Sequence, residues 1–186
     1  MEFLSDRVSV ERAPGRLSVV ISARLSRGRE AVLVAWYVAW AFCGAYVLHE
    51  AWNAPPGRER QFMIAFLAFW LYFMVRIGRV VLWRIKGFES IRVRDGVLTI
   101  KNSILGFGKA ADHYVENISR LGTLEVDRTS WKWQLNESFW VMGAERLCFE
   151  HTGRQVIFGK GLTEEEARQV LAVIKAALTH ERKRVQ

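Results

Sequence analysis

Few residues of this sequence could do chemistry, and they lie far apart along the chain. Histidine occurs at His49, His113, His151 and His180, and no two of these residues have the spacing of a metal site or a catalytic pair. His49 and Glu50 are adjacent and could handle a proton, but a solvated pair at the end of a helix explains them better. We therefore predict no catalytic residue, no metal and no cofactor, and we interpret the protein as non-enzymatic; a small enzyme centred on His49 and Glu50 remains an alternative.

Glycine stands beside lysine in two places where a loop could hold a phosphate group. Residues 106–109 and 159–161 have this composition. The first lacks the full spacing and the Ser or Thr of a phosphate-binding loop, and ordinary turns explain both. The two cysteines, Cys43 and Cys148, have neither the spacing of a metal site nor a context that suggests a bridge, so we expect packed thiols.

Two strongly apolar segments must position everything else. Residues 31–48 and 62–75 lie on either side of a Pro-Pro-Gly turn, and neither carries a charge in its interior. A bilayer core about 30 Å thick needs about 20 helical residues, a length that both segments reach when their flanks are included. The sequence predicts a transmembrane helical hairpin over residues 30–86, with Trp52 and Trp83 at the two membrane interfaces.

The basic residues indicate how this hairpin would be oriented. Six arginines precede the first apolar segment and four basic residues follow the second, whereas the connecting loop holds only Arg58 and Arg60. The positive-inside rule therefore predicts a multi-pass protein of a bacterial inner membrane with both termini in the cytoplasm.

The overall charge is basic, at a formal net +8, and the anionic inner leaflet is the simplest partner for it. Arg76 and Arg79 come early in the last turns of the second helix, and their long stems would let them reach the phosphate level. The predicted lipid-headgroup ligands are Arg76, Arg79, Arg84 and Lys86. The sequence contains no recognised nucleic-acid motif, so we expect no nucleic-acid partner.

Residues 87–186 have the pattern of a small antiparallel sheet closed by one helix. An Asp-Gly pair at 95–96 separates two alternating runs, which is typical of a tight hairpin, and Thr-Gly at 152–153 separates two more. Further strands are predicted over residues 110–114, 118–126 and 131–141. The two turns predict apolar cross-strand pairs on one face: Ile91 with Ile100, Val93 with Leu98, Leu147 with Phe158, and Phe149 with Val156.

A capping box predicts where the C-terminal helix begins. Thr163 and Glu166 have the required spacing, and apolar residues then recur at i, i+3, i+4 and i+7, so one face should pack on the sheet. At the other end of the chain, residues 17–25 predict one strand within a cytoplasmic segment 1–29. Because both termini are expected on the same side, this strand can join the sheet and make the domain discontinuous around the hairpin.

The order of these elements resembles a known type of protein. An N-terminal strand, a two-helix hairpin and the run ERLCFEHTGRQVIFGKGLTEEEA at 145–167 resemble bacterial membrane proteins with a pleckstrin-homology-like domain. The resemblance implies a membrane α+β fold, with a bent antiparallel sheet capped by the C-terminal amphipathic helix and used as a binding platform. One branch of this type assists assembly of photosynthetic complexes. The resemblance brings no catalytic residue.

Aromatic side chains mark the surfaces where we expect a partner. Pairs of alanines in the first apolar segment have the small-xxx-small spacing of a close helix contact, which would leave the bulky aromatic residues facing lipid or another protein. A second aromatic group at 131–133 could be one face of a sheet edge or a docking surface. The predicted partner contacts are Trp36, Trp40, Phe66, Trp70, Phe73, Trp131 and Trp133.

These patterns predict an accessory or assembly subunit of a larger membrane complex, respiratory or photosynthetic, with other membrane-protein subunits and a bilayer containing acidic lipids as its partners. The alternative is a membrane-surface sensor or adaptor that binds acidic phospholipid headgroups through the basic residues after the second helix.

Overall fold

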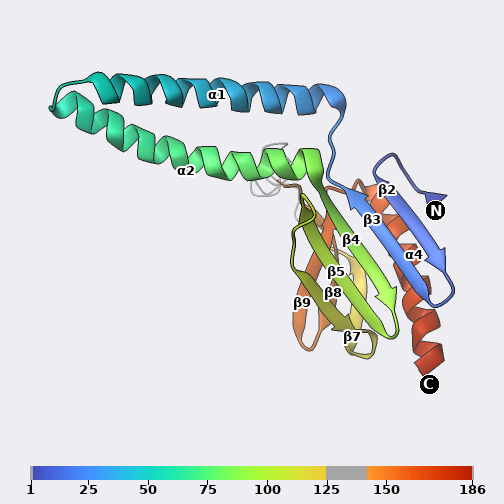
Figure 1. Ribbon diagram of the computed structural model, residues 1–186. Coiled ribbons are helices and arrows are strands. Elements are labelled where there is room, and N and C mark those ends of the chain that lie inside the picture. The colour runs from blue at the N-terminus through green and yellow to red at the C-terminus, as the bar shows by residue number, and fades with distance from the viewer. Residues whose placement is uncertain (1, 125–141, 186) are drawn as a thin grey trace.

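A computed structural model describes residues 2–124 and 142–185 (Figure 1). The strand predicted over 131–141 and the contacts predicted at Trp131 and Trp133 lie outside these residues. The strands are β1 (Glu2–Phe3), β2 (Val8–Ala13), β3 (Arg16–Ser22), β4 (Gly87–Arg94), β5 (Val97–Ile104), β6 (Ala110–Tyr114), β7 (Ile118–Thr123), β8 (Glu145–His151) and β9 (Arg154–Lys160). The helices are α1 (Arg27–Asn53), α2 (Arg58–Lys86) and α4 (Glu164–Val185), with a 3-10 turn at Val115–Asn117.

The first sheet, sheet A, contains six antiparallel strands in the order β1-β2-β3-β4-β5-β6. The predicted turn between β4 and β5 is confirmed: Asp95 and Gly96 both have positive φ, and Ile91 pairs with Ile100 and Val93 with Leu98. This register sets the buried side chains of both strands on the same face, which a shift by one residue would reverse.

The two long helices are inserted between neighbouring strands of sheet A. Strand β3, which precedes α1, pairs along its full length with β4, which follows α2, and the amide of Ala23 donates to the carbonyl of Gly87 at the point of insertion (3.1 Å). This confirms the prediction that the N-terminal strand joins the sheet. The prediction of a single strand in segment 1–29 was wrong, because β1 and β2 pair beside β3.

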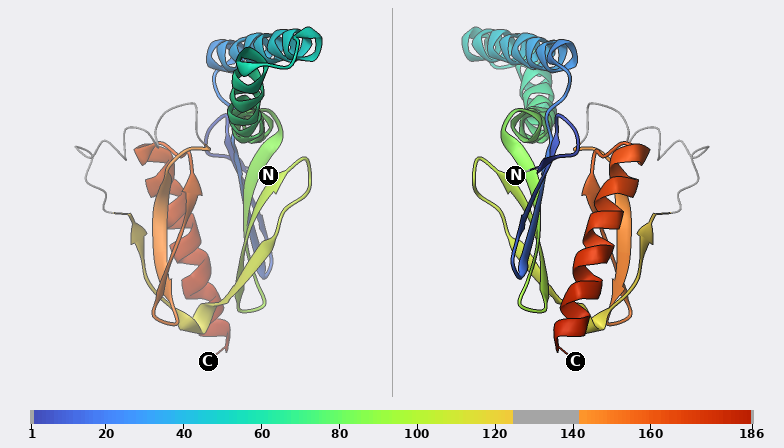
Figure 2. Two further views of the ribbon diagram at one scale, coloured as in Figure 1. Left: turned by 90° about the vertical axis from the view of Figure 1, so that its left-hand side faces the viewer. Right: turned by 90° about the vertical axis from the view of Figure 1, so that its right-hand side faces the viewer.

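Strands β7, β8 and β9 form a separate sheet, sheet B. The predicted pairs of Leu147 with Phe158 and Phe149 with Val156 are confirmed. The expectation of one sheet was wrong: Figure 2 shows two layers that converge where β6 passes through the 3-10 turn into β7. Buried side chains of both layers meet in one core, to which Val19, Ile91 and Phe149 belong.

Helix α4 begins at the predicted capping box and packs against both sheets. The amide of Glu166 donates to Thr163 Oγ1 (3.2 Å), and the amide of Thr163 donates to Glu166 Oε2 (2.8 Å). The predicted apolar face is buried at Ala167, Val170, Ile174 and Leu178. The second layer and this helix together close the core of the β domain.

Helices α1 and α2, with 27 and 29 residues, form a long antiparallel hairpin that projects from the β domain (Figure 1). The expected contact through alanine pairs is wrong, because Ala35, Ala39 and Ala45 are exposed. Glycines supply the close approach: a Cβ on Gly44 would overlap the Trp70 indole, and one on Gly78 would lie 2.6 Å from Oη of Tyr37.

Candidate functional site

His49 and Glu50, which we interpreted as a solvated pair, lie at the exposed far end of α1. His49 and Glu50 are both exposed, and the His49 ring contacts Asn53, whose Nδ2 lies 3.3 Å from Nε2 and donates to the His49 carbonyl (2.9 Å). In the described parts of the chain, no group of three or more His, Cys, Asp or Glu side chains could hold a metal ion. The two cysteines are free, and Cys43 is exposed on α1 rather than packed as we expected.

Two histidines that are far apart in sequence meet between the sheets. His113 of β6 and His151 of β8 have ring centroids 4.8 Å apart, with planes at 77°, and His113 also contacts Phe149 edge-on. Among the described residues, both ring nitrogens of His113 and Nε2 of His151 are buried without a hydrogen-bond partner. Burial and the nearby His151 lower the pKa of His113, although Asp112 acts in the opposite direction.

A buried carboxylate links the two sheets close to the base of the helical hairpin. Glu89 of β4 is 1% exposed, and its Oε2 accepts the amides of Gly159 (2.8 Å) and Lys160 (2.9 Å) at the end of β9. Burial raises the pKa of Glu89, while the two amides and the charge of Lys160 oppose that rise. The residue therefore joins sheet A to sheet B through one side chain.

A second carboxylate links α4 to the N-terminal strands. Glu166 accepts a hydrogen bond from Ser5 Oγ (2.7 Å) and pairs with Arg7 (2.8 Å) while it caps its own helix. Burial raises the pKa of Glu166, but the Thr163 amide, Ser5 and Arg7 together outweigh it and leave the pKa below the usual value. The cap and the ion pair therefore act on the same group.

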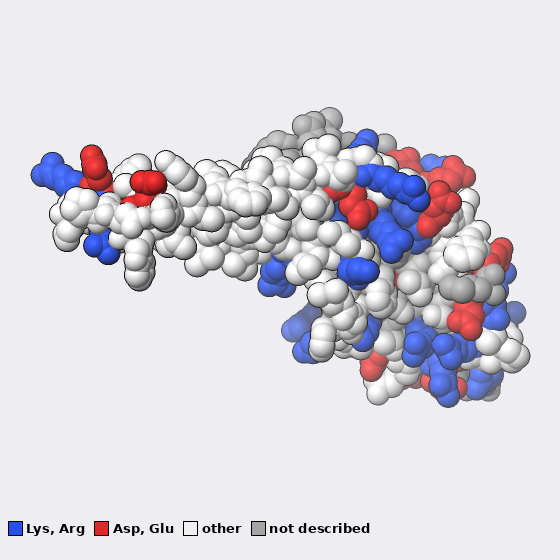
Figure 3. All heavy atoms as spheres, turned by 45° about the horizontal axis from the view of Figure 1, so that its top comes forward, with Lys and Arg blue, Asp and Glu red and all other residues white. Residues whose placement is uncertain are grey.

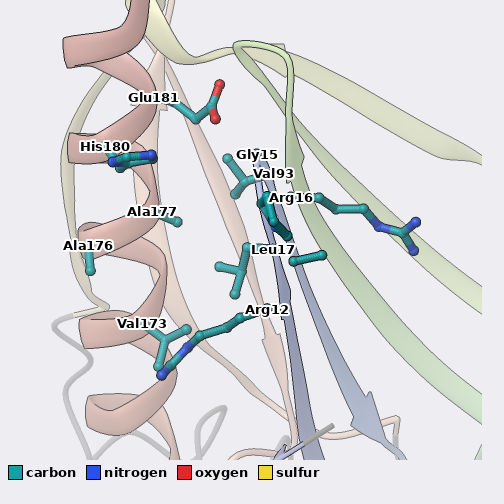
Figure 4. Close-up of a pocket in the computed structure, with 12 residues that line it drawn as sticks. Arg12, Gly15, Arg16, Leu17, Val93, Val173, Ala176, Ala177, His180 and Glu181 are labelled. Atoms are coloured by element: carbon teal, nitrogen blue, oxygen red, sulfur yellow. The ribbon is translucent and has the colours of Figure 1, made fainter.

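A pocket of about 470 Å³ opens between sheet A and α4 (Figure 4). Leu17, Val93 and Val173 form part of its wall, and Figure 4 shows the Arg16 side chain directed away from α4. Its buried acid, Glu181, already accepts the amide of Gly96 (3.0 Å). This pocket offers apolar volume rather than reactive groups.

A larger cavity, which we call the junction pocket, lies where the two helices meet the β domain. It has a volume of about 630 Å³. Residues of the β1–β2 connection, of the segment entering α1 and of the last turn of α2 line it: Asp6, Arg7, Arg24, Leu25, Arg27, Glu30, Ala31, Val34, Ile85 and Lys86. It therefore combines charged side chains with an apolar wall.

The four predicted lipid-headgroup ligands do not lie together. Arg76, Arg79 and Lys86 are exposed, whereas Arg84 is 4% exposed and faces the β domain near Gly143 and Gly161. Arg76 Nη1 donates to Tyr72 Oη (3.0 Å), one turn toward the loop.

The aromatic residues predicted to contact a partner also have different surroundings. Trp36 and Trp40 stack on each other, with ring centroids 5.5 Å apart and planes at 8°. Trp70 lies between the helices, where its Nε1 donates to the carbonyl of Trp40 (2.9 Å). Phe66 and Phe73 are half-buried on α2. Trp83, expected at a membrane interface, is instead buried in the β domain, and its Nε1 donates to the carbonyl of Met142 (2.9 Å).

One apolar turn is exposed beside the end of α2. Leu105 and Phe107 lie in the turn after β5, and Phe107 is 84% exposed. The turn is close to the hairpin because Ile104, the last residue of β5, pairs with Gly87, which directly follows α2. The sequence pattern indicated a turn over residues 106–109 but did not predict that Phe107 would be so exposed.

Comparison with protein-family models, curated proteins and solved structures finds no match. The described residues therefore define the class by structure alone: a two-sheet α+β domain, closed by a C-terminal helix and interrupted by a hairpin of two long apolar helices. Both helices are long and apolar enough to cross a membrane, and only 11% of the most apolar window of each is buried.

Proposed function

We propose that this protein is a non-enzymatic accessory or assembly subunit of a larger membrane complex. In this proposal α1 and α2 span the bilayer, and the β domain is a docking platform on the cytoplasmic side. The observation that carries the proposal is the exposed apolar surface of the hairpin: helices of 27 and 29 residues whose most apolar windows are 11% buried.

Lipid is the environment that this surface fits best. Figure 3 shows a mainly uncharged hairpin, with charged side chains at its tip and at the β domain. Soluble proteins rarely expose contiguous apolar patches larger than a few hundred Å², and a bilayer core about 30 Å thick matches a helix of about 20 residues. Every backbone amide inside such a helix is already hydrogen-bonded, as a hydrocarbon environment requires.

The charges support an orientation with the β domain in the cytoplasm. The basic residues before α1 and after Val75 outnumber Arg58 and Arg60 in the loop, and positive residues are retained on the cytoplasmic side. The two sheets and the terminal helix also support the resemblance to pleckstrin-homology-like domains of a bacterial inner membrane. A reporter fused after Gln186 should be active only in the cytoplasm, and one inserted at Gly57 only outside; the reverse pattern would refute this orientation.

We propose that partner subunits contact the exposed aromatic residues of the hairpin. Trp36, Phe62 and Phe69 remain exposed after the two helices have packed together, and aromatic residues are enriched in protein interfaces. A respiratory or photosynthetic complex is the proposed host. Purification of the tagged protein in mild detergent, followed by native mass spectrometry, should yield a larger complex of fixed stoichiometry. If the protein purifies alone while other complexes of the same membranes survive the detergent, the subunit role is contradicted.

A lipid sensor is the second candidate function, favoured by the exposed cations Arg76, Arg79 and Lys86 in the last three turns of α2. Each basic residue near an anionic surface contributes about 1 kcal/mol of attraction. In this case the reconstituted full chain should change its partners or conformation when acidic lipid is added. An identical state in acidic and neutral vesicles would reject the sensor and leave the subunit role.

A further inference from the structure

The junction pocket holds more positive than negative charge, and part of that charge is not used within the protein. Four cationic side chains and two carboxylates line it. Arg7 is engaged with Glu166 (2.8 Å) and with the carbonyl of Gly161 (3.0 Å). Among the described residues Arg24, Arg27 and Lys86 form no ion pair, and neither do the pocket carboxylates Asp6 and Glu30. With Arg7 paired to Glu166, the remaining three cations and two carboxylates leave the pocket with a net charge of +1.

The register of the two helices shows where the junction pocket lies along the hairpin. Gly44 lies against Trp70 and Gly78 against Tyr37, and continuing this antiparallel register along both helices sets Lys86 level with Arg29. Ala31 and Val34, the apolar side chains that α1 contributes to the pocket, follow within about one and a half turns of this level. The cations consequently lie at the end of the apolar surface, where a phospholipid headgroup meets its acyl chains.

The two kinds of lining residue match the two parts of one molecule. Guanidinium and ammonium groups donate strong, charge-assisted hydrogen bonds to phosphate oxygens, and Ala31, Val34 and Ile85 offer apolar surface beside them. The carboxylates Asp6 and Glu30 can accept hydrogen bonds from hydroxyl groups. A free phosphate ion would use the cations but would leave the apolar wall without a partner.

We propose that the junction pocket binds one anionic phospholipid with a hydroxyl-bearing headgroup, such as a phosphatidylglycerol. Arg24, Arg27 and Lys86 hold its phosphate, Asp6 and Glu30 accept from the headgroup hydroxyls, and the acyl chains lie along Val34 and Ile85. The inference rests on the proposed function, because only a membrane-spanning hairpin brings this pocket to the headgroup level. It assigns the bound lipid to the connection between the hairpin and the β domain.

The test uses the full chain, purified in detergent and stripped of lipid, with lipids added back and counted by native mass spectrometry. Phosphatidylglycerol should bind one to one and survive gas-phase activation. The double variant Arg24→Gln, Arg27→Gln should bind about 30-fold more weakly, from about 1 kcal/mol for each cation. Arg58→Gln, Arg60→Gln removes the same charge from the other end of the hairpin and should bind as the wild type does. Thermal unfolding confirms that both variants are folded.

Three other outcomes of this experiment would overturn the inference. Equal retention of phosphatidylethanolamine would show a pocket that does not select net negative charge, and displacement by inorganic phosphate at equal concentration would show a soluble-anion site. Equal loss in the two double variants would place the lipid elsewhere. Alkaline extraction of native membranes separates the two levels of the proposal: a protein that stays in the membrane but binds no lipid refutes the junction site alone, whereas release into the supernatant refutes the membrane role as well.

Discussion

The helical hairpin and the β domain place apolar and polar groups in opposite ways. The hairpin exposes Phe42, Phe62 and Phe69, and hides a polar contact, Trp70 Nε1 to the Trp40 carbonyl, between its helices. The β domain buries Val19, Ile91 and Phe149 and leaves most of its charges outside. The hairpin is therefore apolar on its outside and the β domain apolar on its inside, and the change occurs within about one helical turn at Trp83 and Arg84.

The two regions also achieve close contact by different means. In the hairpin, glycines allow an aromatic ring of the other helix to approach the backbone, a kind of contact that is common between membrane-spanning helices. In the β domain, apolar side chains from two sheets fill the interior and single polar residues join the layers. The hairpin is therefore expected to be sensitive to added volume, and the β domain to lost hydrogen bonds.

The largest effect is expected at the polar connection between the sheets. Glu89→Ala leaves the amides of Gly159 and Lys160 without their acceptor. A buried polar group left unsatisfied costs about 1–3 kcal/mol, so we expect the free energy of unfolding to fall by about 3 kcal/mol in a denaturant titration of the purified protein.

An exposed carboxylate supplies the control for Glu89. Glu150→Ala removes an ion pair with Arg120 (2.9 Å) at the surface of sheet B, and such pairs contribute about 1 kcal/mol or less. Equal losses for Glu89→Ala and Glu150→Ala would show that the connection between the sheets does not depend on the buried acceptor.

The hairpin should respond next most strongly, and to added volume. Gly44→Leu inserts a side chain where the Trp70 indole lies, and overpacking of a close contact costs about 1–3 kcal/mol. We expect a loss of about 2 kcal/mol in detergent, measured by thermal unfolding with circular dichroism. Gly28→Leu is the matched control in the same helix, because no atom of the described residues beyond its own helical turn lies within 4 Å of a Cβ at Gly28. A Gly44 variant as stable as the Gly28 variant would mean that α1 and α2 do not pack through this glycine.

The features predicted from the sequence are those that local signals encode. The turn at Asp95–Gly96, the cap at Thr163 and the two apolar segments each depend on residues within one turn or one helix, and the structure contains all of them. Strand β2 was not predicted from the sequence, because only Val8 and Val10 alternate on its buried face before charged residues follow. Short alternations of this kind are too weak a signal to assign a strand.

The candidate sites, by contrast, depend on contacts across the chain. Glu89 and Gly159 are 70 positions apart, and the meeting of His113 with His151 depends on how two sheets pack. The surroundings of Arg84 also depend on the fold. Its charge indicated a lipid ligand, but its side chain is buried against the β domain. The junction pocket combines residues from three segments, and no pattern within any one of them marks it.

The pH dependence of stability sharpens the comparison within the β domain. The pKa of His113 is lowered in the folded protein, so the unfolded chain binds a proton first as the pH falls through about 6.5. The free energy of unfolding should therefore decrease below that pH. The raised pKa of Glu89 acts oppositely, with stability lost as the pH rises above about 4.5.

Substitution separates the histidine contribution from that of Glu89. His113→Phe should reduce the loss of stability between pH 7.5 and 5.5, measured by thermal unfolding, because residue 113 can then no longer bind a proton. His180→Gln, at an exposed position of α4, should keep the wild-type pH dependence. The same slope in all three proteins would show that another group controls stability in this range.

The smallest effect on stability is expected at the turn after β5. This turn also tests where the proposed boundary between membrane and water lies. Phe107 is 84% exposed, so Phe107→Cys should change the free energy of unfolding by less than about 0.5 kcal/mol. In the proposed membrane orientation, its position beside the end of α2 would bring the ring into the membrane interface rather than water. In a background with Cys43→Ala and Cys148→Ala, a polarity-sensitive fluorophore on residue 107 should shift to the blue on reconstitution into vesicles. The same probe on residue 3, where Phe3 is 71% exposed on the edge strand β1, should keep the spectrum of a probe in water. Matching spectra at the two positions would mean that the β domain stands clear of the bilayer, and the boundary between the two solvents would then coincide with the end of the helices.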